Sequence, residues 1–165
     1  MTTIHVRDSL QNYQYQLAEP EGANFAPDFQ PELTPAEMLE LGVFGGHYFE
    51  GEHSEFPAEW FKDARLSATH DSLQNYFEID ASQSREEWQR KGWIYDDDPR
   101  GWFQWYCRYY LGRRIPDEDA RQIKRWRMMT RHVGQIKAFC SPGDITCRRR
   151  QRQALLHWAY DSRKI

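Results

Sequence analysis

The sequence predicts a mainly α-helical fold, a compact single domain of residues 1–165 with five or six helices around a central aromatic helix. Three observations favour it. The chain of 165 residues is long enough to bury a substantial core. Aromatic residues make up 15% of it, including seven Trp, which argues against disorder. Its C-terminal half spaces apolar residues at helical intervals. We expect at most a small β element near the N-terminus.

The central aromatic helix is predicted over about residues 99–111. Asp98 is placed to cap its start, and Pro99 suits a first helical position. Gly112 and Pro116 then end it.

This helix carries six aromatic side chains within nine residues, 102–110, which occupy most of its circumference. A helix that is apolar on nearly all sides is a buried one. One polar stripe remains, formed by Arg100, Gln104 and Arg108 at four-residue spacing. Buried arginines require a carboxylate or a ligand, because an unpaired buried charge is costly.

The N-terminal part of the chain reads as an extended segment, residues 1–33, that wraps the core. Ile4 and Val6 alternate with polar residues, as do the apolar residues of 13–17, and each alternation is a weak strand signal. Residues 19–33 are rich in Pro and acidic residues, and we expect Phe25 and Phe29 to be tucked into the core.

Three short helices are predicted before the central one. The first, 34–42, has a capping box of Thr34 and Glu37. The second covers 57–66, and the third, 84–91, begins at Ser84. Between the second and third, a short extended piece is expected at 76–79.

The Gly-rich segment 42–53 leaves two interpretations open. Glycines let the backbone approach a ligand closely, but they also mark tight turns beside a core. The segment lacks the spacing and the Lys of a phosphate-binding loop.

Two helices are predicted after the central one, a long helix over about 117–139 and a last one over about 145–160. Ile123, Trp126 and Ile136 belong to one apolar stripe of the long helix. The last helix carries arginines at its positively polarised N-terminal end, so an acidic group should lie nearby.

Several stretches together resemble a family of short bacterial and plant proteins: LGVFGGHYFEGE, EFPAEWF, DDPRGWFQWYCRYYLGRR, DEDARQIKRW and RRRQRQALLHWAYDSRKI. The resemblance extends from about Leu33 to Ile165, and the aromatic helix is its most specific part. It implies a free-standing single domain and no particular reaction, so no site residue follows from it. The repeated DSLQNY, at residues 8–13 and 71–76, lies in no wider repeat and is assigned no function.

Charge is distributed unevenly along the chain. Residues 1–99 contain 6 Lys and Arg against 20 Asp and Glu, whereas residues 100–165 contain 16 against 5. Either the acidic half packs on the basic half, or part of the basic half faces outward and binds an anion such as nucleic acid. Arginine forks suit phosphate, and exposed aromatic faces can stack on bases. The predicted anion-binding residues are Arg100, Arg108, Arg113, Arg114, Arg148, Arg149, Arg150 and Arg152.

Other chemistries have weaker signals. Three Cys, an odd and low number, fit reduced thiols of a cytoplasmic protein. No pair of Cys or His has the spacing of a structural zinc site, so we expect no metal or other cofactor.

Cys107 next to Arg108 could be an activated thiol, but a small core residue is the simpler interpretation. Mean hydropathy is −0.92, and neither a membrane span nor a signal peptide is expected.

Three functions remain open from the sequence. The leading hypothesis is a non-enzymatic module that binds nucleic acid or another anion through the basic half. The second is a small enzyme that acts on an acidic small molecule between the 42–53 loop and Arg100/Arg108. The third is a protein-interaction module. The oligomeric state is left open.

Overall fold

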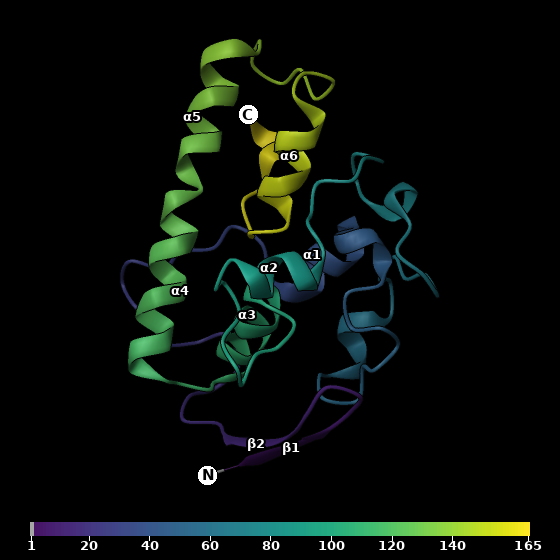
Figure 1. Cartoon of the computed structure of the whole chain (residues 1–165). Helices are drawn as coiled ribbons and strands as arrows, with labels where there is room; N and C mark the ends of the chain where they lie inside the picture. Colours follow the sequence, from purple (N-terminus) through teal and green to yellow (C-terminus); the bar gives the residue numbers. More distant parts are fainter. Residues whose placement is uncertain (1) are drawn as a thin grey trace.

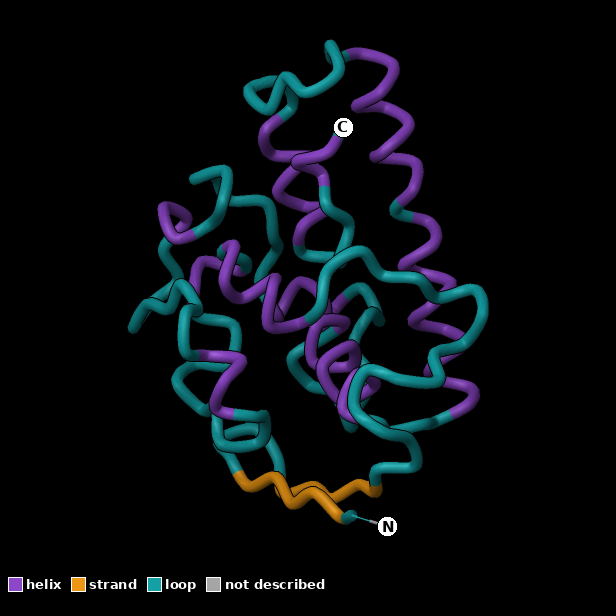
Figure 2. Tube along the Cα trace, turned by 180° about the vertical axis from the view of Figure 1, so that it is seen from behind, coloured by secondary structure: helices purple, strands orange, loops and turns teal. Residues whose placement is uncertain are grey.

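The computed structural model describes residues 2–165, and the fold is mainly helical (Figures 1 and 2). The predicted fold class is confirmed: the molecule is a compact single domain with a buried aromatic cluster and a small N-terminal sheet. The helices are α1 (Pro35–Leu41), α2 (Arg85–Arg90), α3 (Trp102–Leu111), α4 (Pro116–Met128), α5 (Thr130–Phe139) and α6 (Arg149–Leu156). Short 3₁₀ turns cover Phe44–Gly46, Ala58–Phe61, Ser72–Gln74 and Ser162–Lys164. No helix within the described part of the chain is long and apolar enough to cross a bilayer.

The N-terminal β element is a two-stranded antiparallel hairpin of β1 (Thr3–Arg7) and β2 (Asn12–Gln16), with Val6 opposite Tyr13. Both alternating segments of the sequence therefore form strands. The chain that follows lies along α3 and inserts Phe29 among its aromatic rings, where that side chain is 1% exposed. Phe29 is thus buried as expected, whereas Phe25 is half-buried and packs against the core.

The two DSLQNY copies share a local structure. Asp8 Oδ1 accepts the Leu10 backbone N–H at 2.9 Å, and Asp71 Oδ1 accepts that of Leu73 at 3.0 Å. Each Asp thus forms a turn with its own backbone two residues on. The first turn joins β1 to β2 and the second opens a 3₁₀ turn, so the two copies share the Asp turn and then differ in structure.

The helices before α3 match the sequence predictions in part. Helix α1 has the predicted capping box, with Thr34 and Glu37 each bonded to the backbone of the other. Helix α2 begins after Ser84, as expected. Segment 57–66 is only a 3₁₀ turn over its first half, and 76–79 forms no strand, because Glu78 has a positive φ of 55° that interrupts extended backbone.

Helix α3 begins at Trp102, three residues later than predicted, and Asp98 does not cap it. The N-cap is Gly101, whose φ of 100° is strongly disfavoured for residues with a side chain. The Asp98 carboxylate is instead drawn into ion pairs with Arg108 and Arg113. Gly112 ends the helix as expected.

The predicted long helix is two helices, α4 and α5, which continue along one side of the molecule (Figure 1). Around Met129 the backbone hydrogen bonds shorten to three-residue steps, from Met129 N to the Trp126 carbonyl and from His132 N to the Met129 carbonyl. Thr130 Oγ1 also donates to the Arg127 carbonyl, which competes with helical bonding there.

The last helix is shorter than predicted, since α6 covers Arg149–Leu156 instead of about 145–160. Before it, Cys140 and Cys147 form a disulfide that closes the loop between α5 and α6. The expectation of three reduced thiols is therefore wrong for this pair, and Cys107 is the free cysteine. A seven-residue separation gave no sign of this pairing, because the loop has to fold back on itself first.

Helix α3 lies at the centre of the core, as the sequence predicts. Trp105, Tyr106 and Cys107 are at most 1% exposed. Helices α1 and α4 contact α3, and α6 packs beside α5 (Figure 1). The aromatic residues of α3 therefore form the core, and two of them, Trp102 and Phe103, also line a cavity.

Candidate functional site

The polar stripe of α3 is satisfied inside the protein, most completely at Arg108. This side chain is fully buried, and all five of its N–H groups have acceptors. Glu55 accepts from Nε and Nη2 at 2.7 and 3.0 Å. Asp98, the Asp97 carbonyl and Gln11 accept the other three at 2.8, 2.6 and 2.7 Å. Arg108 therefore has no donor left for an external anion.

Arg100 and Arg113 are likewise paired internally. Arg100 contacts Glu52 at 2.6 Å and Glu50 at 3.2 Å. Arg113 contacts both oxygens of Asp98, at 2.7 and 2.6 Å. Carboxylates of the acidic half thus neutralise these arginines, as expected if the two halves pack together.

Arg114 and Arg152 bind backbone carbonyls. Arg114 stacks on the Tyr109 ring at 3.7 Å and donates to the Ala23 carbonyl at 2.9 Å. Arg152 is fully buried and donates to the Cys147 and Ser162 carbonyls, both at 2.8 Å. Both side chains therefore hold neighbouring segments together.

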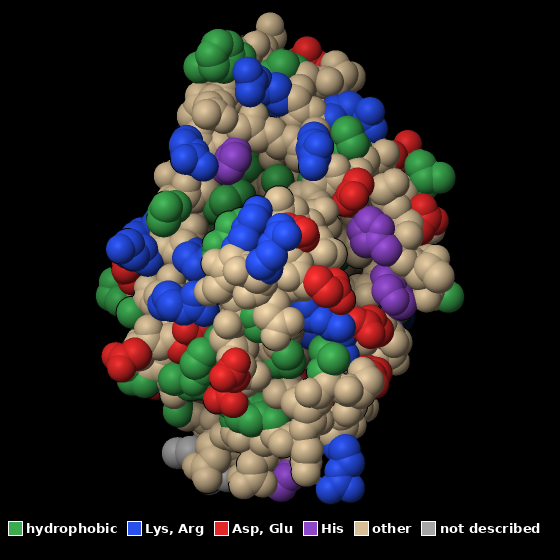
Figure 3. Space-filling view, viewed as in Figure 1, with side chains coloured by type: hydrophobic (Ala, Val, Ile, Leu, Met, Phe, Trp, Pro, Cys, Tyr) green, Lys and Arg blue, Asp and Glu red, His purple; other side chains and the backbone are tan. Residues whose placement is uncertain are grey.

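Arg148, Arg149 and Arg150 differ, because all three are exposed. Within the described residues, no carboxylate lies at ion-pair distance from any of them. Figure 3 shows several Lys and Arg side chains over the upper half of the molecule, where α5 and α6 lie (Figure 1). Arg149 donates through Nη2 to the Phe77 carbonyl, but none of the three charges is neutralised by a described carboxylate, so an anion could pair with them.

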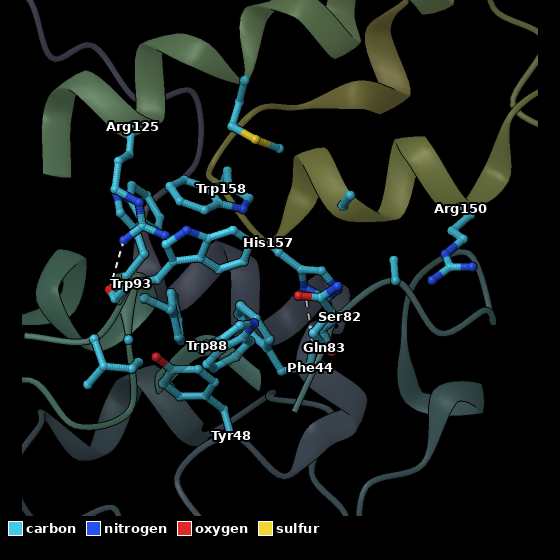
Figure 4. A pocket seen from close by; sticks show the side chains of 17 residues that line it. Phe44, Tyr48, Ser82, Gln83, Trp88, Trp93, Arg125, Arg150, His157 and Trp158 are labelled. Carbon is cyan, nitrogen blue, oxygen red and sulfur yellow. Dashed lines mark hydrogen bonds between the residues drawn. The ribbon is translucent and has the colours of Figure 1, made fainter. Parts of the chain in front are cut away.

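A cavity of about 320 Å³ lies beside the N-terminal end of α3, between α2, α4, α6 and the turn that contains Phe44. Seven aromatic side chains from these separate segments converge on it (Figure 4). They are Phe44, Tyr48, Trp88, Trp93, Trp102, Phe103 and Trp158. The cavity is therefore a mostly apolar site with many flat walls.

His157 is a buried polar group in the cavity wall. Its Nδ1 accepts the Phe44 backbone N–H at 3.3 Å, which places the proton of a neutral ring on Nε2. Nε2 is buried and has no partner among the described residues. Burial, together with the nearby His70, lowers the pKa of His157 to about 3, so the ring is neutral at pH 7. It offers one unsatisfied N–H donor.

Arg125 of α4 supplies the positive charge at one end of the cavity (Figure 4). It donates to the Trp93 carbonyl at 3.1 Å and to Gln122 at 2.9 Å, and its guanidinium lies 5.3 Å from the Trp158 ring centre. No described carboxylate pairs with it. Burial and the neighbouring Arg121 lower the pKa of Arg125 to about 10, so it still carries its charge at pH 7.

A second hollow of about 140 Å³ adjoins the first and shares Phe44, Tyr48 and Trp88 with it. It is bordered by the 42–53 loop and by Arg100, but Arg108, the other arginine of the second sequence hypothesis, does not line it. Arg100, however, is held by Glu50 and Glu52, so it carries no free charge into this hollow.

The Gly-rich loop serves as a tight turn and also contributes to a cavity wall. A Cβ on Gly42 would lie 2.1 Å from the Gln74 carbonyl oxygen, so close packing requires glycine there. The same turn presents Phe44 and Tyr48 to the cavity. The tight-turn interpretation therefore describes the segment, and close approach of a ligand to its backbone stays a prediction.

The other chemical candidates are not assembled into a site. Cys107 is fully buried, and burial raises the pKa of its thiol well above the ordinary value. Among the described residues, no three His, Cys, Asp or Glu side chains form a group that could hold a metal ion.

The sequence contained the cavity residues but gave no sign that they meet. Arg125 is one of several arginines on α4, and His157 lies next to Trp158 within the predicted last helix. Their proximity depends on how α2, α4 and α6 pack around α3. The one sequence signal for such a site was the number of Trp residues: the chain has seven, and only two of them lie on the central helix.

In comparisons with family models, curated proteins and solved structures, no match to this chain was found. The family resemblance seen in the sequence therefore stays a prediction.

Proposed function

We propose that this protein binds a small, flat, largely apolar molecule in the aromatic cavity. The observation that carries the proposal is the convergence of seven aromatic side chains on one space of about 320 Å³. Small-molecule sites are typically apolar clefts of about 300–1,000 Å³ with a few polar groups that set the orientation of the ligand. His157 and Arg125 are polar groups of this kind.

The distribution of charge supports a small ligand over the anion site expected from the sequence. Six of the eight predicted anion-binding arginines are engaged by carboxylates or carbonyls of the protein itself. Arg125 was not among those predicted, and it combines a free charge with aromatic neighbours.

Filling the cavity tests the proposal. In Ala154→Phe, a ring is added on α6 at a position that lines the cavity, and we expect binding of a two-ring probe to fall at least about tenfold. The matched control is Ala120→Phe, at an exposed position of α4. Calorimetric titration with 2-naphthamide measures the affinity, and indole N–H signals of Trp88 and Trp93 locate the probe. Absence of binding to the unaltered protein, or equal binding by both variants, would show the proposal to be wrong.

A second candidate function is nucleic-acid binding at the exposed start of α6, as the sequence favoured. The supporting observation is that Arg148 and Arg149 have no ion-pair partner among the described residues. In this case affinity for a labelled duplex or single strand falls steeply with salt. Arg148→Gln with Arg149→Gln should weaken it, whereas Arg90→Gln with Lys91→Gln should not. Absence of binding at low salt would rule this function out.

A further inference from the structure

Arg125 has one edge of its guanidinium free. Its two hydrogen bonds to the protein both come from Nη1, to the Trp93 carbonyl and to Gln122. Neither Nε nor Nη2 donates to any described residue. This Nε–Nη2 edge presents two parallel N–H groups, the geometry that suits the two oxygens of a carboxylate.

The same chain shows what this edge binds elsewhere. Arg108 holds Glu55 through Nε and Nη2 at 2.7 and 3.0 Å. Arg121 holds Glu118 in the same way at 2.6 and 2.9 Å, and Arg163 holds a third carboxylate at 2.8 and 2.9 Å. In Arg125 the equivalent edge is unoccupied. Of these four arginines, Arg125 alone lines the aromatic cavity.

Of the three carboxylates on α4, Glu118 is the one that acts electrostatically on Arg125, and it is not available for pairing. Glu118 already accepts both N–H groups of Arg121 and the Gln122 side-chain amide, the last at 3.0 Å. A partly buried guanidinium without a carboxylate is costly, and an anion from outside the protein would remove that cost.

The surroundings of Arg125 indicate which kind of anion fits. The guanidinium lies over the Trp93 and Trp158 rings, at 5.6 and 5.3 Å from their centres. Trp158 in turn packs against Trp102 at 4.7 Å. A carboxylate on Arg125 therefore places whatever is attached to it among flat aromatic walls.

We propose that the ligand of the cavity is a planar aromatic carboxylate, with its carboxylate on the Nε–Nη2 edge of Arg125 and its ring system against Trp102 and Trp158. The inference rests on the proposed function and adds the charge and shape of the ligand. Arg125 is then the residue that selects acids over neutral molecules of the same shape.

The test compares 2-naphthoate with 2-naphthamide, a neutral molecule of nearly the same shape, by calorimetric titration at pH 7. The unaltered protein should bind the acid at least about tenfold more tightly than the amide. Hydrogen bonds between a guanidinium and a carboxylate are stronger than those between a guanidinium and a neutral amide. Arg125→Gln should abolish the preference, so that the variant binds the acid and the amide with equal affinity. Lys124→Gln, which removes one exposed charge from the same helix, should keep the preference. Arg125→Lys, which keeps the charge but loses the two-point edge, should give an intermediate preference.

The outcomes separate the two proposals. If the protein binds acid and amide equally, or if Arg125→Gln keeps the preference, the carboxylate inference is wrong and the proposed function stands. If neither probe binds, both are wrong. Should Arg125→Gln fail to fold by circular dichroism, the Nε–H signal of Arg125 in the unaltered protein decides. It should shift with the acid and stay in place with the amide, and an equal response to both would contradict the inference.

Discussion

The carboxylate of Asp98 binds the guanidinium of Arg113 through both of its oxygens, at 2.7 and 2.6 Å, with both side chains buried. One of the same oxygens also accepts from Arg108 at 2.8 Å. A single acidic side chain thus joins the start of α3 to two arginines near its end. Three buried charged groups depend on one another.

Removal of the Asp98 charge should be strongly destabilising. In Asp98→Asn, Arg113 loses its only carboxylate partner in the described chain and Arg108 loses one of two. Breaking a buried ion pair by removing one partner typically costs about 3–5 kcal/mol. Urea unfolding should show this loss, whereas Asp96→Asn, at an exposed position, should stay within about 0.5 kcal/mol of the unaltered protein. A loss below about 1 kcal/mol in Asp98→Asn would contradict the burial of this network.

Two glycines should respond to alanine in opposite directions. At Gly112, φ is 127° and a Cβ would lie 2.0 Å from the Glu19 carbonyl oxygen, so Gly112→Ala should lose about 2 kcal/mol or more. Gly134 lies inside α5 with nothing near its Cβ position. Gly134→Ala should therefore gain about 0.5–1 kcal/mol, because alanine favours a helix interior. Thermal unfolding of both variants checks the signs.

His157 should make the protein sensitive to acid. Its pKa is about 3 in the folded protein, below the ordinary value of 6.5, so the unfolded chain takes up the proton first as the pH falls. The contribution of His157 to the free energy of unfolding is fully present above pH 6.5. It falls by about 1.4 kcal/mol per pH unit as the pH is lowered from 6.5 to 3. In His157→Asn, the side-chain oxygen can still accept the Phe44 N–H without titrating. Its unfolding free energy should therefore depend less steeply on pH. His5→Asn, at an exposed histidine, should retain the original slope.

The Cys140–Cys147 disulfide predicts how many cysteines of the chain react with a thiol reagent. Under denaturing, non-reducing conditions a thiol reagent should react with one group per chain, Cys107, and native protein should react far more slowly because that thiol is buried. Cys140→Ser with Cys147→Ser should lower stability by about 2–3 kcal/mol, the loop-closure value for a short loop. Three reactive thiols in the denatured protein would contradict the disulfide.

The sequence by itself determined the elements whose signals are local. Thr34 and Glu37 specify the start of α1, Gly112 the end of α3, and the alternation around Val6 a strand, because each depends on neighbours within a few residues. The crowded aromatics of α3 also identified the core, since no single face of a helix can hold them.

Tertiary structure alone decided which charged side chains pair and which aromatic side chains surround a cavity. The sequence predicts Asp98 as a helix cap, but in the folded chain its carboxylate pairs with two arginines near the other end of α3. Arg125 resembles its neighbours on α4 until the packing of α2 and α6 surrounds it with indole rings and leaves it without a carboxylate. Ion pairing and cavity formation depend on distances between segments far apart in the chain. Local patterns carry no such distances, so the candidate site emerged only from the folded chain.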